Sequence, residues 1–142
     1  MMRKIFKSKF LEDTKKIAIS VADSLGSYRV ICLYGEMGAG KTTFVKAFAK
    51  HLGVSSRVLS PTYTFVRRYE FGSKKLYHVD AYRIEDSQSD IESLAEIISQ
   101  DNTIVLIEWA EKIQKILPEE RIDIEFSYNR DNVREIIITK KG

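Results

Sequence analysis

The feature that most constrains this chain is the run GEMGAGKT at residues 35–42. It fits the pattern G-x-x-x-x-G-K-[ST] at every fixed position. A short apolar, β-branched run at 29–34 leads straight into it, and apolar residues recur at helical spacing from 41 to 52. Because a phosphate-binding loop requires a strand before it and a helix after it, this context favours such a loop over a chance glycine-rich turn.

The loop predicts where a nucleotide binds. Its glycines let successive backbone N–H groups point inward at phosphate oxygens, and the helix after it adds its positive dipole end. We expect Lys41 to bridge the β- and γ-phosphates and the Thr42 hydroxyl to ligate Mg²⁺. The expected nucleotide-binding residues of this segment are Gly35, Glu36, Met37, Gly38, Ala39, Gly40, Lys41, Thr42 and Thr43.

Glu108 is the expected second protein contact of the Mg²⁺. It follows the four apolar residues 104–107, the form of a hydrophobic strand that ends in an acid. The alternative is a solvated acid at the start of a helix, where acids are also favoured. The next residue, Trp109, is either a core anchor or a lid over the site.

Asp80 ends another apolar stretch and is a second candidate for catalysis. We expect it to orient the attacking water or to hold a metal-bound water, unless it pairs with Arg83 at a turn. His78, two residues earlier, is either a packed strand residue or part of the site. The hydroxyl-rich segment 60–64 is either a switch that senses the γ-phosphate or a connecting loop.

Adenine is the expected base. The chain contains no guanine-reading N/T-K-x-D run, and Asp80 is not followed by the glycine of a D-x-x-G switch. ATP with Mg²⁺ is therefore the expected nucleotide, with Lys41, Asp80 and Glu108 as the expected catalytic residues.

Length and composition fit one soluble domain. A chain of 142 residues suits a single core, so we expect one P-loop ATPase domain over 1–142. The single cysteine, Cys32, lies in an apolar run and excludes an internal disulfide, which favours a reducing compartment. No signal-peptide pattern and no segment of about 20 apolar residues occurs, so we expect a cytoplasmic protein without membrane contact. The net charge of +3, with acids and bases interspersed, argues against direct nucleic-acid binding.

Hydrophobic spacing predicts alternating strands and helices. Helices are expected over 13–25, with Asp13 or Thr14 as N-cap and Gly26 as stop, over 41–52, over 91–98 and briefly over 113–117. Strands are expected over 29–34, 64–71, 75–82, 103–107, 121–128 and 133–139, with hairpin turns at 72–73 and 129–132. The predicted class is α/β: a three-layer fold of the P-loop NTPase type, whose mixed sheet has a parallel centre and antiparallel hairpins and is flanked by helices.

Four ordered motifs together resemble the bacterial TsaE (formerly YjeE) family of small P-loop ATPases. Residues 35–44 look like their phosphate loop, and 60–64 resemble their S-P-T-[FY]-x stretch. Residues 78–83 resemble their H-x-D-x-Y-R element, and the pair 108–109 is similar to their E-W pair. Order, spacing and length agree along nearly the whole chain, which makes the resemblance far more specific than the P-loop alone.

The resemblance implies a role in the threonylcarbamoyl modification of the adenosine beside the anticodon, in tRNAs that read codons beginning with A. In that family the ATPase works with the TsaB and TsaD proteins, and its hydrolysis is thought to reset their complex, so tRNA is involved indirectly. The resemblance also implies that Lys41 contacts phosphate, that Thr42 and Glu108 bind Mg²⁺ and that Asp80 is a suspected catalytic residue. Because family members contact the nucleotide from both terminal segments, Thr14 and Arg130 are the expected contacts there.

Two other functions stay open. A free-standing small-molecule kinase is one, since many kinases place a P-loop on a compact α/β domain. Such a kinase needs several lid arginines, and only Arg67, Arg68 and Arg83 are near enough in sequence. A nucleotide-binding scaffold is the other, because no arginine finger is assignable and an unassisted site is slower by about 10³–10⁵. We therefore expect weak basal ATP hydrolysis that partners stimulate.

Overall fold

The computed structural model describes residues 2–35, 40–54, 65–84, 88–129, 131 and 133–142. The strands are β1 (Met2–Ser8), β2 (Val30–Gly35), β3 (Val66–Phe71), β4 (Lys74–Asp80), β5 (Thr103–Glu108), β6 (Arg121–Tyr128) and β7 (Arg134–Lys141). The α-helices are α1 (Leu11–Asp23), α2 (Lys41–Leu52) and α3 (Gln88–Ser99), and the 3₁₀ helices are η1 (Ala81–Arg83) and η2 (Ala110–Ile116). None of the described helices is long and apolar enough to cross a membrane.

The strands form one sheet in the order β1-β7-β6-β2-β5-β4-β3. Its centre is parallel, because β2 pairs in parallel with β5 and β6, and β4 pairs in parallel with β5. Its outer parts are antiparallel: β3 pairs with β4, β6 with β7, and β1 with β7. The predicted mixed sheet with a parallel centre and antiparallel hairpins is confirmed.

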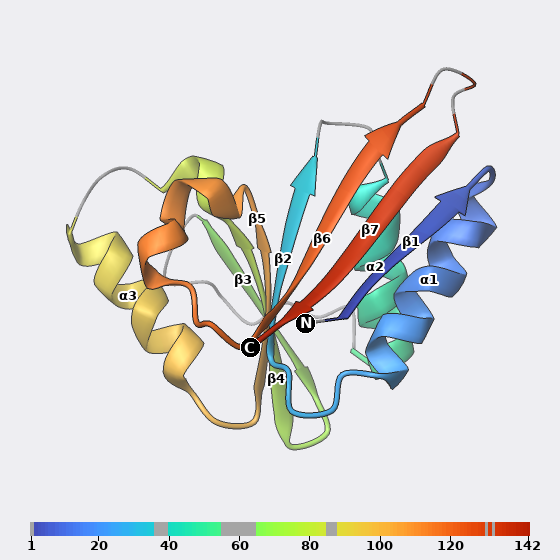
Figure 1. Cartoon of the computed structure of the whole chain (residues 1–142). Coiled ribbons are helices and arrows are strands. Elements are labelled where there is room, and N and C mark those ends of the chain that lie inside the picture. The colour runs from blue at the N-terminus through green and yellow to red at the C-terminus, as the bar shows by residue number, and fades with distance from the viewer. Residues whose placement is uncertain (1, 36–39, 55–64, 85–87, 130, 132) are drawn as a thin grey trace.

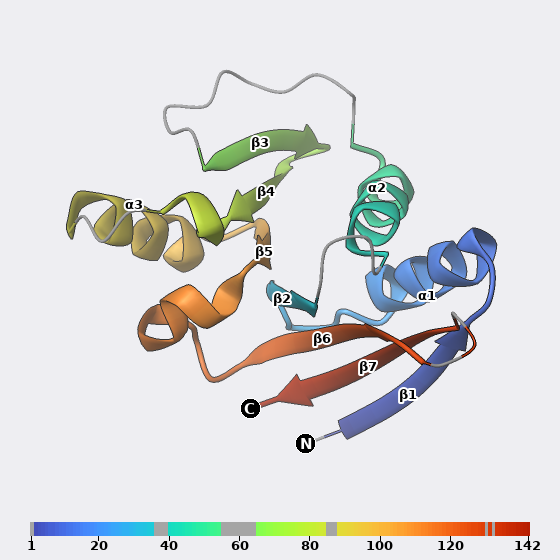
Figure 2. The ribbon, with the colours of Figure 1, turned by 90° about the horizontal axis from the view of Figure 1, so that it is seen from above.

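Helices cover both faces of the sheet, which makes three layers (Figure 1 and Figure 2). On β5, Ile104 and Leu106 pack with α1 and α2, whereas Val105 and Ile107 pack with α3 and η2. Apolar side chains on both faces are what a buried parallel strand requires. Because side chains alternate along a strand, Glu108 lies on the face of β5 that α2 covers.

Two phenylalanines anchor α2 to the sheet. Phe44 and Phe48 are fully buried, and their rings stack with a centroid distance of 6.0 Å. Phe44 also meets the ring of Phe126 on β6 edge-on at 5.7 Å. Aromatic burial of this kind is among the larger packing contributions in a core. The first turn of α2 is therefore fixed beside the end of β2.

The expectations were wrong at the N-terminus and shifted at several element ends. β1 was not expected, and α1 begins at Leu11 with Phe10 as N-cap. Asp13 lies inside the first turn, where its carboxylate accepts hydrogen bonds from the backbone N–H groups of Lys9 (3.0 Å) and Phe10 (3.1 Å). It therefore caps the helix from within, as the glutamate of a capping box does. Helix α1 ends at Asp23, before Gly26, and α3 begins earlier than expected, at Gln88.

Candidate functional site

The carboxyl ends of three parallel strands meet at one edge of the sheet. β2 ends at Gly35, β4 at Asp80 and β5 at Glu108. The strand register pairs Glu108 with Asp80 on one side and with Leu33 on the other. The two acids therefore lie beside the end of the strand that enters the glycine loop. In open α/β sheets this edge is where ligands bind.

Gly35 ends β2 in a conformation that requires glycine. Its φ is +134°, and a Cβ atom there would lie 2.3 Å from the carbonyl oxygen of Phe126 on β6. Only a residue without a side chain allows this approach of two backbones. The first glycine of the motif thus lets β2 and β6 pack closely where the loop begins.

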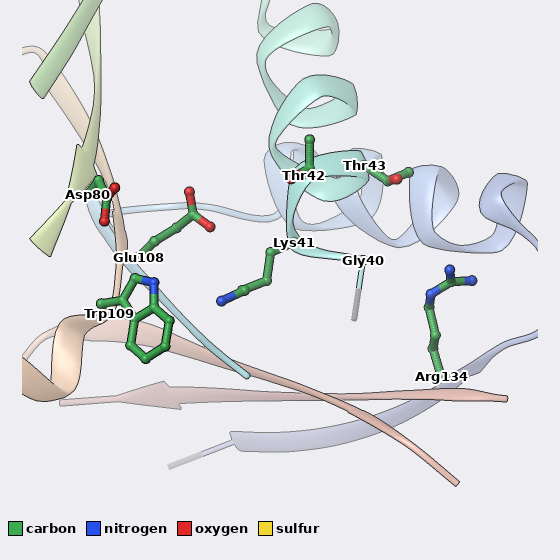
Figure 3. A pocket seen from close by; sticks show the side chains of 8 residues that line it. All are labelled: Gly40, Lys41, Thr42, Thr43, Asp80, Glu108, Trp109 and Arg134. Carbon is green, nitrogen blue, oxygen red and sulfur yellow. The ribbon is translucent and has the colours of Figure 1, made fainter. Parts of the chain in front are cut away.

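A pocket of about 290 Å³ opens at this edge (Figure 3). Its lining residues are Gly40, Lys41, Thr42, Thr43, Asp80, Glu108, Trp109 and Arg134. The structure therefore brings together the last residue before α2, the first turn of α2 and the two acids, all of which were expected at the site from the sequence. Arg134 was not expected.

Lys41 is nearly buried beside the pocket. The residue is 6% exposed, and its ammonium donates a hydrogen bond of 2.6 Å to the carbonyl oxygen of Gly35. The same nitrogen lies 5.0 Å from the centroid of the Trp109 ring, within the range of a cation–π contact. Figure 3 shows the side chain directed toward Trp109 and away from Arg134. The cation is thus held inside the pocket by a neutral carbonyl and an aromatic face.

Trp109 forms one wall of the pocket through a special backbone conformation. Its φ of +59° and ψ of 39° lie in the left-handed region, which residues other than glycine rarely adopt. Its ring lies 5.1 Å from the ring of Tyr82 and packs against the core beneath α3 and η2. Trp109 therefore both contacts the core and lines the pocket, so the two roles expected for it are not exclusive.

Glu108 is bonded to His78 of the neighbouring strand. The Nε2 atom of His78 lies 2.6 Å from a carboxylate oxygen of Glu108, and both side chains are about one-fifth exposed. This hydrogen bond lowers the pKa of the Glu108 carboxyl below its ordinary value, against the opposing effect of burial, and Lys41 adds an electrostatic effect in the same direction. Glu108 is therefore ionised at neutral pH. His78 is more than a packed strand residue, because it holds this carboxylate.

Asp80 is more exposed than Glu108 and is bonded at both oxygens. One oxygen accepts a hydrogen bond of 3.1 Å from the backbone N–H of Tyr82, and the other lies 3.3 Å from Nε of Arg83. The alternative of an Asp80–Arg83 pair at a turn is thus present in the structure. The carboxylate nonetheless lines the pocket, so the pair does not remove it from the site.

Arg134 enters the pocket from the first position of β7. The hairpin register pairs it with Tyr128, and its guanidinium carbon lies 5.4 Å from the centroid of the Tyr128 ring. Its Nε atom is buried without a hydrogen-bond partner in the described part of the chain. A Cβ atom on Gly40 would lie 3.3 Å from Cδ of Arg134, so the side chain passes close to the start of α2. The hairpin was predicted around 129–132, but which of its side chains reach the pocket depends on the strand register, which the sequence pattern does not supply.

The remaining expected site residues are not in this pocket or lie outside the described residues. Thr14 is fully buried on α1, with its hydroxyl 2.7 Å from the hydroxyl of Ser8, and its contact with a nucleotide stays a prediction. Among the expected site residues, those outside the described ranges are Glu36, Met37, Gly38, Ala39, Arg130 and the segment 60–64.

A strand that enters a G-x-x-x-x-G-K-T loop, a helix directly after the loop, and acids at the ends of the neighbouring parallel strands define a fold of the P-loop NTPase type. Comparison with known families assigns the chain more narrowly. The family described as "Threonylcarbamoyl adenosine biosynthesis protein TsaE" matches residues 8–136. The chain belongs to this family, which confirms the resemblance stated from the four motifs.

Individual relatives agree with this assignment. The tRNA threonylcarbamoyladenosine biosynthesis protein TsaE of Bacillus subtilis (strain 168) is 42% identical over 131 residues, which cover 92% of this chain and 82% of the relative. The protein of the same name from Aquifex aeolicus (strain VF5) is 41% identical over 132 residues, covering 92% and 91%. The crystal structure of Bacillus subtilis YdiB is similar with a TM-score of 0.80 and 34% identity, covering 99% of this chain and 87% of that one. These similarities extend over nearly the whole chain, so the shared fold includes the site.

Proposed function

We propose that this protein binds ATP with Mg²⁺ and hydrolyses it, and that the hydrolysis serves tRNA threonylcarbamoyladenosine biosynthesis. The observation that carries the proposal is the meeting of Lys41, Asp80 and Glu108 in one pocket, at the end of the strand that enters the glycine loop. Membership of the TsaE family supports the biosynthetic role.

The phosphates are bound from two sides in this proposal. When the nucleotide binds, the Lys41 ammonium turns from the carbonyl oxygen of Gly35 to oxygens of the β- and γ-phosphates. An anionic oxygen is the stronger hydrogen-bond acceptor for an ammonium group. The N-terminus of α2 supplies backbone N–H groups that lack partners within the helix. Arg134 approaches from the other side of Gly40 and brings a second positive charge to the pocket (Figure 3).

The residues present fit a magnesium ion. Mg²⁺ is held in phosphate-binding sites by one or two protein oxygens together with phosphate oxygens and water. Glu108 provides an ionised carboxylate and the exposed residue Thr42 provides a hydroxyl, and both line the pocket. When bound, Mg²⁺ neutralises charge on the β- and γ-phosphate oxygens. The part of His78 is to hold the Glu108 carboxylate in one orientation through the hydrogen bond that it donates.

Asp80 orients the attacking water. A carboxylate has about four acceptor positions, of which the Tyr82 N–H and Arg83 occupy two. Those two contacts fix the direction of the group, and the remaining lone pairs accept a hydrogen bond from water. Such positioning speeds hydrolysis only when the water lies in line with the γ-phosphorus and the oxygen that leaves it.

Slow basal hydrolysis and dependence on partners complete the proposal. None of the arginines in the described ranges is assignable as an arginine finger, and Arg83 is already paired with Asp80. We propose that the partners are TsaB and TsaD, that they act in the cytoplasm, and that tRNAs reading codons beginning with A are modified by that complex and not by this chain. The four motifs shared with the family support this assignment.

The test is ATP hydrolysis by the wild type and by Lys41→Ala, each alone and then with TsaB and TsaD. Lys74→Ala is the matched control, because it removes an exposed lysine far from the pocket in the β3–β4 hairpin. We expect a low rate that rises with both partners, is lost in Lys41→Ala and is kept in Lys74→Ala. A rate that ignores the partners, or phosphate transfer to a small acceptor that outpaces transfer to water, would contradict the proposal and favour a kinase.

A further inference from the structure

A second hollow lies between α1 and α2, next to the nucleotide pocket. Its volume is about 820 Å³. We call it the α1–α2 groove. Its lining residues are Leu11, Glu12, Lys15, Lys16 and Ile19 of α1 and Thr43, Lys46, Ala47, Lys50 and His51 of α2. Figure 2 shows the two helices side by side on one face of the sheet, and a 2.7 Å contact between Asp23 and His51 joins their C-terminal ends.

Apolar side chains in this groove remain uncovered. Leu11 is 51% exposed and Ile19 is 37% exposed. With Lys15 between them they follow one another at intervals of four residues, so they lie along one side of α1. Ala47, a small residue on α2, lines the groove opposite them. Exposed large apolar residues gathered in one hollow mark a binding surface more often than a solvated face.

Lysines surround these apolar residues. The groove is lined by four lysines and one glutamate, and that glutamate, Glu12, is already paired with Lys15 at 3.1 Å. Lys16, Lys46 and Lys50 take part in none of the ion pairs found within the described ranges. The groove therefore offers uncompensated positive charge at the edge of an apolar surface.

We propose that the α1–α2 groove receives an acidic amphipathic helix from a protein partner. Two helices side by side leave a groove into which a third helix packs its apolar residues, spaced at three and four positions. Carboxylates along the edges of that helix would face Lys16, Lys46 and Lys50, and charge complementarity of this kind sets both the orientation and the rate of association.

The lining favours a peptide over RNA. Single-stranded RNA is bound by stacking of bases on aromatic side chains along a basic groove. Among its described lining residues the α1–α2 groove has no Phe, Tyr or Trp, whereas Leu11, Ile19 and Ala47 give it an apolar floor. Phosphates gain nothing from such a floor, but the apolar side chains of a helix do.

The groove and the nucleotide pocket share one lining residue. Thr43, in the first turn of α2, lines both hollows. A helix seated in the groove therefore contacts the turn whose backbone faces the phosphates. If the partner binds the nucleotide-bound form more tightly, the nucleotide must be bound more tightly in the complex by the same factor. This coupling rests on the proposed ATPase function, whereas the docking does not.

The experiment uses the full chain and a fluorescent synthetic helix of about 15 residues, roughly the length of α1. Leucines at three- and four-residue spacing form its apolar stripe, and glutamates flank them. Fluorescence anisotropy measures binding to the wild type, to Lys46→Glu/Lys50→Glu and to Ile19→Asn. The matched control, Lys74→Glu/Lys115→Glu, makes the same change of charge at two exposed lysines away from the groove.

We expect the peptide to bind the wild type and the control alike, and both groove variants to bind at least about tenfold more weakly. Circular dichroism checks that each variant is folded. No binding to the wild type, or equal weakening in the control, would overturn the proposal. So would a single-stranded oligouridine that binds the groove in place of the peptide, since it would identify an RNA surface. Peptide binding by a chain that hydrolyses no ATP even with TsaB and TsaD present would refute the proposed function and leave the docking intact.

Discussion

Removal of the Arg134 guanidinium tests the assignment of this residue to the nucleotide site. The perturbation is Arg134→Ala, with Arg134→Lys as the variant that keeps the charge but loses the planar fork of donors. Arg134 was not expected from the sequence, and its place beside Gly40 comes from the strand register alone.

The size of the effect follows from the charge of the guanidinium. Arg134 lines the pocket, where a phosphate would accept a charged hydrogen bond from its donors. A hydrogen bond to a charged group contributes about 1.5–3 kcal/mol, which corresponds to a loss of about 10- to 150-fold in the Kd of a nucleotide in Arg134→Ala. Loss of the contact with Tyr128 at 5.4 Å removes only about 0.5–1 kcal/mol of stability. Arg134→Lys should lie between the wild type and Arg134→Ala.

The assay is isothermal titration calorimetry with Mg²⁺ and a non-hydrolysable ATP analogue, together with thermal unfolding of each variant. Arg3→Ala is the matched control, because Arg3 is an exposed arginine on the edge strand β1 and does not line the pocket. Wild-type affinity in Arg134→Ala, measured beside a Lys41→Ala variant that no longer binds, would refute the reasoning. So would a loss of affinity that merely follows a loss of folded protein.

Three further predictions follow from single residues. Gly35→Ala should destabilise the fold by about 2–5 kcal/mol, from the left-handed backbone and the overlap with Phe126. Gly26→Ala, which meets nothing within 4 Å, should cost only about 1–2 kcal/mol, and equal losses in urea unfolding would contradict the argument. Burial raises the pKa of the Cys32 thiol to about 12, so the folded protein should carry a thiolate fraction on the order of 10⁻⁴ at pH 8. Ellman's reagent should therefore react rapidly only after unfolding, and fast reaction with the native protein would show that the thiol is accessible. His78→Asn should raise the Mg²⁺ concentration needed for nucleotide binding about tenfold or more, because a hydrogen bond to a carboxylate is lost. Metal-free nucleotide affinity should not change, and an unaltered Mg²⁺ midpoint would reduce His78 to a packing residue.

The centre of the fold could be predicted because local and long-range signals agree there. Apolar runs bounded by glycine or acids gave the bounds of β2 and β5 closely, and helix α2 begins and ends as its spacing indicated. β1 was missed because it is an edge strand whose exposed lysines hide the alternation. Asp13 was misplaced because Phe10 and Leu11 are exposed, so the apolar pattern gives no sign of where α1 begins.

The candidate site also contains residues that the sequence predicted and residues that it did not. Lys41, Thr42, Asp80 and Glu108 could be expected because each stands directly after a strand or at the start of α2, and the carboxyl ends of parallel strands share an edge. Arg134 could not be identified from local pattern, because its place in the pocket depends on hairpin register. The hydrogen bond between His78 and Glu108 likewise depends on β4 and β5 being neighbours, although their sequence positions are 30 apart.

Trp109 has a strained backbone conformation at the edge of the pocket. At φ +59° any residue with a Cβ atom is strained, and glycine would relieve about 1–2 kcal/mol. The chain instead keeps a tryptophan whose ring contacts Lys41 and Tyr82. Glycine at this position would relax the turn, but it would also remove the packing of the ring on the core and one wall of the pocket. The ring packs against the core and also lines the pocket, so the strain of this one residue is offset by packing while it serves the site.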